Sequence, residues 1–166
     1  MNINYDIPKI QQILCDLSNL TGLSMAFLDS NYQGQCRCIN STDFCSAIQA
    51  SGEFAGKCAN SDKSVLQKCK QSRHFESHIC YAGLYDAAMP IIKDGIFAGV
   101  IIMGRIRLEG DEQNSFLSDN PEFCDLYRKL PSLSASQIES LKNLFPNILF
   151  QNGIYINHDI DTEEIC

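Results

Sequence analysis

Three cysteines on separate predicted elements are candidates for a metal site or a thiol-lined pocket. Cys45 lies in a short predicted helix, Cys58 in a longer one, and Cys80 at the entrance to a predicted strand. If these elements pack together, three thiolates and one open position would suit a metal ion that also takes an outside ligand. Burial as three small core residues is the alternative, because cysteine without a partner behaves as a small hydrophobe. The spacing leaves both interpretations open.

A second pair of thiols, Cys36 and Cys38, flanks Arg37 in a strand-like run. Alternation along a strand sends both thiols to the same face. Structural zinc sites more often use two cysteines separated by two residues, and that spacing occurs nowhere in the chain. The nine cysteines are odd in number and no export signal precedes them, so a disulfide framework is not expected. We therefore expect a half-buried strand here.

Polar side chains also stand among apolar ones in two other places. In the longer helix, spacing of i, i+4, i+7 and i+11 puts an acidic group and two thiols on one face, at Cys58, Asp62, Val65 and Cys69. The run CYAGLYD, which begins at Cys80, puts a thiol, a phenol and a carboxylate before an otherwise apolar strand. Small-ligand pockets are mostly apolar with a few placed polar groups, so this pattern favours a binding pocket.

Composition and motifs argue against several classes of function. The net charge is −7 and the basic residues at 63–74 are spaced as on a solvated helix face, so direct nucleic-acid contact is not expected. No apolar run reaches membrane-spanning length and the N-terminus lacks the features of a secretion signal, which predicts a cytoplasmic location. No nucleophile elbow, phosphate-binding glycine loop or zinc-protease motif occurs, so we do not expect an enzyme.

Apolar periodicity and turn signals predict an α+β domain, in which helices pack on an antiparallel sheet. The expected elements are a helix at 7–20, a hairpin with strands at 23–30 and 35–39, helices at 41–50 and 56–72, a hairpin with strands at 77–93 and 96–105, a polar loop at 108–120, and closing helices at 121–130 and 134–151. The Asp-Gly turn at 94–95 pairs Lys93 with Ile96. A regular count from this turn places Arg105 diagonal to Asp86, at a separation that long side chains can bridge.

The second hairpin, CYAGLYDAAMPIIKDGIFAGVIIMGRI, resembles the PocR sensory domain. That family carries C-H-A-G-L-x-D, then an apolar-Pro-Ile strand, a glycine turn and a strand that ends in G-Q-hydrophobic. Upstream, DFCSAIQASGEFAGKCANSDKSVLQKC resembles the family's F-C-x-x-I segment and the C-x-x-x-D helix that follows it. The likeness covers about Ile10 to Leu149. It implies a PAS-like α+β sensor of small hydrocarbon derivatives such as diols, at the front of AraC-type transcription regulators or histidine kinases.

Two positions depart from the family pattern. Tyr81 stands where the family has histidine, and Arg105 stands where it has glutamine. A guanidinium could pair with Asp86 or with a carboxylate or phosphate of the ligand. The ligand class of the family is therefore open for this chain, and a small acid is an alternative to a diol.

These observations lead to one interpretation and one alternative. Residues 1–150 are expected to form a ligand-sensing domain, and 151–166 a tail or linker toward a DNA-binding or kinase module. We expect a cytoplasmic homodimer that contacts neither nucleic acid nor membrane. The resemblance implies that a small organic ligand binds without a cofactor at Cys45, Cys58, Asp62, Cys80, Tyr81, Asp86 and Arg105. The alternative is a redox sensor with zinc or an iron–sulfur cluster on Cys45, Cys58 and Cys80, with Cys69 or Cys38 as a fourth candidate ligand.

Overall fold

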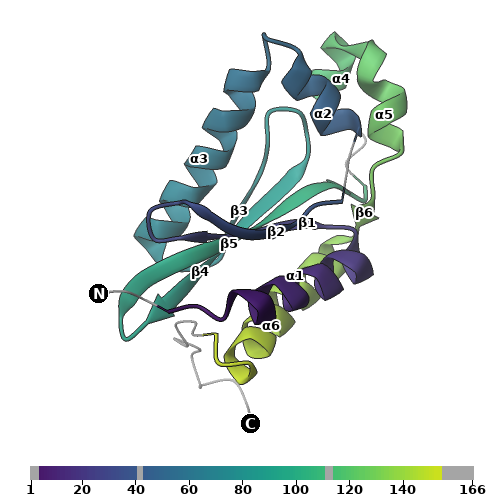
Figure 1. Ribbon diagram of the computed structural model, residues 1–166. Coiled ribbons are helices and arrows are strands. Elements are labelled where there is room, and N and C mark those ends of the chain that lie inside the picture. The colour runs from purple at the N-terminus through teal and green to yellow at the C-terminus, as the bar shows by residue number, and fades with distance from the viewer. Residues whose placement is uncertain (1–3, 41–42, 111–113, 155–166) are drawn as a thin grey trace.

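Five antiparallel strands form the centre of the molecule in the order β2-β1-β5-β4-β3, and a sixth joins β5 in parallel (Figure 1). This computed structural model describes residues 4–40, 43–110 and 114–154. The strands are β1 Ser24–Asp29, β2 Gly34–Cys38, β3 Glu76–Ile79, β4 Tyr85–Lys93, β5 Ile96–Leu108 and β6 Ser132–Leu133. The predicted α+β fold, an antiparallel sheet with flanking helices, is confirmed.

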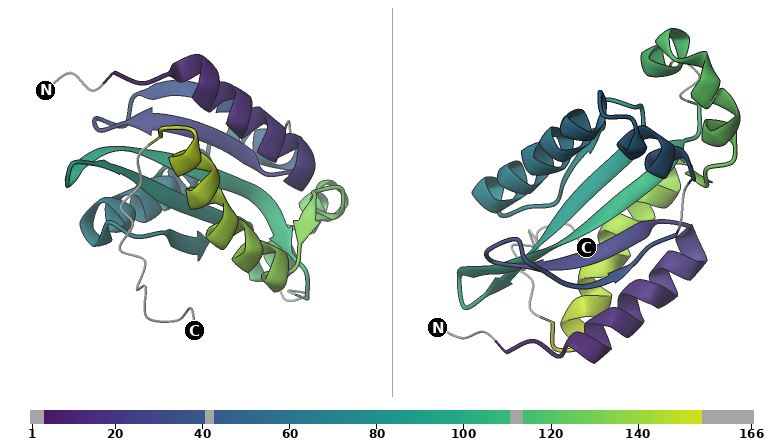
Figure 2. Two further views of the ribbon diagram at one scale, coloured as in Figure 1. Left: turned by 90° about the horizontal axis from the view of Figure 1, so that it is seen from below. Right: turned by 45° about the horizontal axis from the view of Figure 1, so that its top comes forward.

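The helices divide between the two faces of the sheet and one end (Figure 2). They are α1 Ile7–Thr21, α2 Asp43–Ala50, α3 Ala55–Ser72, α4 Ser115–Asp119, the 3-10 helix η1 Pro121–Phe123, α5 Cys124–Arg128 and α6 Ala135–Gln151. Helices α1 and α6 cover one face, α3 lies against the other, and α2, α4 and α5 gather at one end (Figures 1 and 2). None of the helices within these described ranges is long and apolar enough to cross a membrane.

Strand alternation separates two faces of different character. The face under α1 and α6, which we call the packed face, carries large side chains that form the main core, among them Met25, Phe27, Met89, Ile101 and Met103. The residues between them point to the face under α3, which we call the open face. There Val65 and Cys69 of α3 pack on Ala88 and Val100, with Leu28 and Ile102 partly buried beside them. The open face is therefore lined by smaller and more polar groups.

The helix ends follow the expected chemistry. Gly22 ends α1 at a φ of 78°, and its backbone N–H donates to the Ser18 carbonyl at 2.8 Å. Ser134 begins α6 with a capping box, in which its hydroxyl accepts from the Gln137 backbone N–H and the Gln137 side chain accepts from the Ser134 N–H. These caps fix α1 and α6 across the packed face.

The prediction of one strand over residues 77–93 was wrong. The chain forms β3, turns at residues 80–84, and only then enters β4. The Cys80 backbone N–H donates to the Leu84 carbonyl at 2.7 Å, and Gly83 has a φ of 82°, which favours glycine. Likewise, part of the predicted polar loop at 108–120 forms α4. Most of the predicted tail, residues 155–166, lies outside the described residues.

The predicted pairing of Lys93 with Ile96 is correct, but the regular count beyond it was not. Two register shifts interrupt the β4–β5 ladder. The second shift lies between two pairs, Tyr85 with Ile106 and Asp86 with Gly104. Arg105 is therefore the extra residue of a β-bulge rather than a regular partner on the ladder.

Candidate functional site

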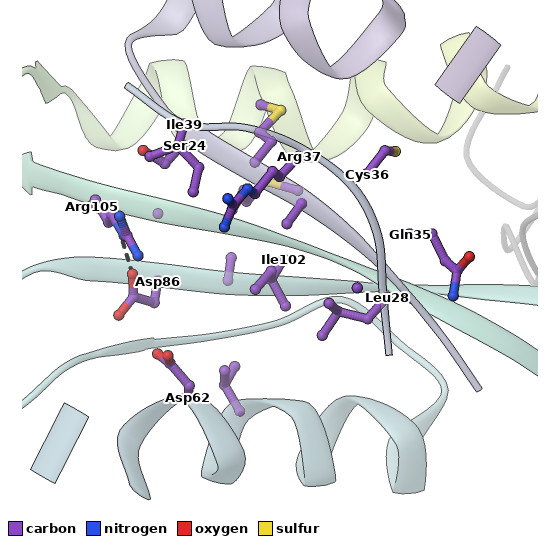
Figure 3. A pocket seen from close by; sticks show the side chains of 17 residues that line it. Ser24, Leu28, Gln35, Cys36, Arg37, Ile39, Asp62, Asp86, Ile102 and Arg105 are labelled. Carbon is purple, nitrogen blue, oxygen red and sulfur yellow. Dashed lines mark hydrogen bonds between the residues drawn. The ribbon is translucent and has the colours of Figure 1, made fainter. Parts of the chain in front are cut away.

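A cavity of about 420 Å³ lies between the open face and α3 (Figure 3). Side chains from β1, β2, β4, β5 and α3 line it. Its apolar part includes Leu28, Val65 and Ile102, and its polar part includes Arg37, Asp62, Asp86 and Arg105. The open-face residue Ala26 of β1 is small and leaves space there, whereas the Asp86 carboxylate lies over Gly104 at the polar end. Such a size and lining are typical of a small-molecule site.

The β-bulge on β5 builds the polar end of the cavity. Arg105 has a φ of 65°, and its backbone N–H donates to Asp86 Oδ1 at 3.2 Å (Figure 3). A Cβ at Gly104 would collide with the Asp86 carboxylate, so glycine there lets the carboxylate lie over the strand. The predicted contact between Arg105 and Asp86 therefore exists, but it uses the arginine backbone.

The Arg105 side chain is left available at the cavity. No carboxylate of residues 4–40, 43–110 or 114–154 forms an ion pair with its guanidinium. Asp62 reaches toward the polar end from α3, and Arg37 reaches toward the cavity from β2 (Figure 3). The cavity thus holds two guanidinium groups and two carboxyl groups, an arrangement that suits a ligand with both an acidic group and a hydrogen-bonding group.

Burial shapes the ionisation of the carboxyl groups. Burial first, and then the nearby Asp62 carboxylate, raise the pKa of Asp86 to about 7, although the Arg105 backbone N–H and charge act in the other direction. Burial also raises the pKa of Asp62, while Arg105 and His78 lower it. The Asp62 side chain is exposed to solvent and points from α3 toward the polar end of the cavity. Near neutral pH, Asp86 is therefore a hydrogen-bond donor in a large fraction of molecules.

His78 stands beside this carboxyl pair without completing a catalytic arrangement. It pairs with Asp86 across β3 and β4, and its Nε2 lies 4.0 Å from Asp86 Oδ2. The same nitrogen lies 3.4 Å from Ser61 Oγ. A serine–histidine–aspartate triad needs the two contacts on different ring nitrogens, so this group is not one. Burial lowers the pKa of His78, which favours a neutral ring.

The other predicted site residues lie in a neighbouring aromatic cluster. Cys45, Cys58, Cys80 and Tyr81 are partly buried against a set of rings that includes Phe44, Phe54, Phe116, Phe123 and Tyr127. Cys58 Sγ lies 3.7 Å from the Tyr81 hydroxyl oxygen, and that hydroxyl also donates to the Phe54 carbonyl at 3.4 Å. These four residues therefore border the polar end, but they do not line the cavity.

The chemistry of these thiols does not favour the metal alternative. Within the described part of the chain, no three histidine, cysteine, aspartate or glutamate side chains form a group that could hold a metal ion. Burial raises the pKa of Cys80 to about 12 and also raises the pKa of Cys58. Metal binding requires thiolates, and a raised pKa opposes their formation. The predicted ligand set of Cys45, Cys58 and Cys80 thus packs as part of an apolar cluster.

Sequence reasoning missed the contribution of β2. Gln35 and Arg37 line the cavity from this edge strand, and Ile39 lines it just beyond the strand's end. The signal was present, because alternation that sends Cys36 and Cys38 to one face sends Arg37 to the other. The missing information was which of the two faces holds the cavity.

Comparison with known proteins assigns the family. A family model described as the sensory domain found in PocR matches residues 5–151. The chain belongs to the PocR sensory-domain family. This PocR domain is 24% identical over 147 residues to the regulatory protein PocR of Salmonella typhimurium strain LT2. The match covers 84% of the chain and 48% of that protein, so the chain spans about half the length of this curated relative.

Two solved structures resemble the PocR domain weakly. The cofactor-binding GAF domain of the nutrient sensor CodY from Clostridium difficile is 12% identical with a TM-score of 0.39, and the match covers 72% of this chain and 79% of that one. A GAF domain/HD domain protein from Geobacter sulfurreducens is 14% identical with the same TM-score, 0.39. The match covers 74% of this chain and 87% of that one.

Proposed function

We propose that this PocR domain senses a small organic ligand that binds in the cavity between the open face and α3. The observation that carries the proposal is the cavity itself, about 420 Å³ in volume, with apolar walls and one polar end. Family membership supports a sensory role. Three of the seven predicted site residues, Asp62, Asp86 and Arg105, line this cavity. The other four, Cys45, Cys58, Cys80 and Tyr81, lie in the aromatic cluster.

The charges at the polar end favour a small acid over a neutral diol. Arg105 carries a guanidinium with no ion pair among the described residues, so the acidic group of a ligand can take that place. Asp86, with its pKa raised to about 7, can donate a hydrogen bond to a carbonyl or hydroxyl oxygen of the same molecule. A short hydroxy acid or keto acid meets both requirements.

The wider role follows from the same proposal. Ligand binding would change the packing of the terminal helices and so signal to a DNA-binding or kinase module in a cytoplasmic homodimer. Residues 1–150 would form the sensing domain, and 151–166 the linker. The curated relative is a regulatory protein about twice as long as the matched region, which supports a separate output module. The domain would not be catalytic, in keeping with the histidine contacts described above.

A thermal-shift screen of short carboxylic, hydroxy and keto acids and of short diols tests the proposal. We expect at least one acid to raise the melting temperature, because a ligand that binds only the folded state stabilises it. Ala26→Phe fills the cavity and should abolish the shift. Ala135→Phe adds the same ring at an exposed site at the start of α6 and should retain it. A shift that survives Ala26→Phe would place the ligand elsewhere, and a response to diols alone would refute the acid preference.

A further inference from the structure

Helix α1 and edge strand β2 are held together by a row of side-chain contacts on the packed face. At one end, Gln11 Nε2 donates to the Arg37 carbonyl at 2.8 Å. At the other end, Asn40 Nδ2 donates to the Ser18 carbonyl at 3.2 Å and to Ser18 Oγ at 3.0 Å. The two contacts are seven residues apart on α1, a rise of about 10.5 Å, and they lie on either side of the C-terminal end of β2.

A pair of thiols lies between the two ends of this row. Cys15 is one turn beyond Gln11, whose Nε2 also donates to Cys15 Sγ at 3.2 Å. Cys38 follows Arg37 on β2, and its thiol is in hydrogen-bonding contact with the Cys15 thiol and with Ser18. Both cysteines are partly exposed, and neither is in a disulfide. A small oxidant can therefore reach two thiols that lie close together on neighbouring elements.

We propose that Cys15 and Cys38 are an oxidation site, at which peroxide closes a reversible disulfide between α1 and β2. The Cys15 thiolate attacks a peroxide oxygen, which forms an S–O bond, breaks the O–O bond and releases hydroxide. The contact with Cys15 and then burial raise the pKa of Cys38, so Cys38 is assigned to the second step. The second sulfur then displaces hydroxide from this sulfenic acid and forms the S–S bond. The two thiols lose two protons and two electrons in total, and hydrogen peroxide becomes two molecules of water.

Cys36 is the competing thiol, and the structure favours Cys38 over it. Alternation places both on the face toward α1, and both pack against the main core. However, Cys15 acts on the Cys36 thiol only through its charge, whereas it is in hydrogen-bonding contact with Cys38. Cys36→Ser is therefore a matched control, because it removes a neighbouring thiol and leaves the proposed pair intact.

The disulfide would act on the wall of the cavity. Among the described strands, β2 is at the sheet edge and pairs with β1 alone. Its residues Gln35 and Arg37 line the cavity on the opposite face. A covalent link to α1 would limit the motion of this wall, and it would do so whatever ligand the cavity binds. The oxidation site thus stands independently of the proposed function.

Peptide mapping after peroxide treatment tests the site. The folded protein is oxidised at a pH of about 8.5, where more thiolate is present, then alkylated and digested with trypsin without reduction. Trypsin cuts after Arg37, so the proposed link joins two peptides, and fragment spectra separate Cys38 from Cys45. We expect a Cys15–Cys38 link that dithiothreitol reverses and that forms about tenfold or more faster in the folded chain than in urea, because folding holds the thiols together.

Variants and hydrogen exchange complete the test. Cys15→Ser and Cys38→Ser should each remove the link, while Cys36→Ser should keep it, and alanine replaces serine where a serine variant fails to fold. Amide exchange in β2 should slow in the oxidised protein. Equal rates of linkage in folded and unfolded chains, or a link from Cys15 to Cys36 in place of Cys38, would overturn the proposal. The mapping of the unaltered protein decides between these outcomes even without variants.

Discussion

The two faces of the sheet are made by alternate residues of the same strands, yet they differ in almost every property. On β5, Ile101 and Met103 point to the packed face, where α1 and α6 exclude water. The residues next to them, Ile102 and Gly104, border the cavity under α3. On β4, Ala87 is buried in the main core, and its neighbour Asp86 holds the bulge at the polar end.

The difference shows how one sheet can supply stability and binding at once. Apolar area on the packed face is removed from water, and this burial stabilises the fold. The open face gives up part of that gain because small side chains leave space between the sheet and α3. Changes on the packed face should therefore affect stability first, and changes on the open face should affect binding first.

Truncation of two consecutive isoleucines gives the largest expected contrast. Ile101 has 0% of its surface exposed, whereas Ile102 is partly exposed at the cavity. Ile101→Ala should lower the free energy of unfolding by about 3–4 kcal/mol through lost burial and a new void, and Ile102→Ala by about 1 kcal/mol. Urea unfolding measures both. Equal losses would mean that the open face is packed as tightly as the other, which contradicts the comparison.

The pH dependence of stability offers an effect of intermediate size at Asp86. Its pKa is raised to about 7 in the folded chain from its ordinary value of 3.8, so the folded state binds more protons between these values. Stability should therefore fall as pH rises through that window. Asp86→Asn keeps an oxygen that can accept from the Arg105 N–H but removes the buried charge.

We expect Asp86→Asn to be more stable than the wild type at pH 8 by about 1–2 kcal/mol, with the difference absent at low pH. Urea unfolding curves of both proteins, collected between about pH 4 and pH 8, give the difference in free energy of unfolding at each pH. Because the pKa of Asp62 is also raised and that of His78 is lowered, only the difference between the two proteins reports on Asp86. A difference that does not change with pH would show that Asp86 is not the titrating group.

Sequence patterns predicted the elements well because periodicity and turn residues act locally. The Asp-Gly turn set the first pairs of the β4–β5 ladder, and the helix bounds followed from their caps. The bulge at Arg105 could not be predicted from the sequence, because it depends on a hydrogen bond between strands, from the Arg105 backbone N–H to the Asp86 carboxylate. Likewise, the thiol pattern indicated three cysteines on packed elements, but only the packing shows that their partners are aromatic rings.

Replacement of Arg105 by glutamine should have the smallest effect on stability and so gives the sharpest test of the open face. The contact with Asp86 uses the backbone N–H, which glutamine also has, and the left-handed φ of 65° strains either side chain equally. We expect Arg105→Gln to change the free energy of unfolding by less than about 0.5 kcal/mol, as is usual for a substitution that breaks no buried contact.

The double variant with Asp86→Asn separates this backbone contact from a side-chain ion pair. Unfolding in urea at pH 8, without added ligand, should give free-energy changes for the two substitutions that add to within about 0.5 kcal/mol, because the guanidinium forms no ion pair with that carboxylate. A coupling above about 1 kcal/mol would mean that a salt bridge holds the bulge. Two results together would place the role of Arg105 in ligand binding. The free-energy changes of the two substitutions would be nearly additive, and Arg105→Gln would lose the thermal shift that small acids cause in the wild type.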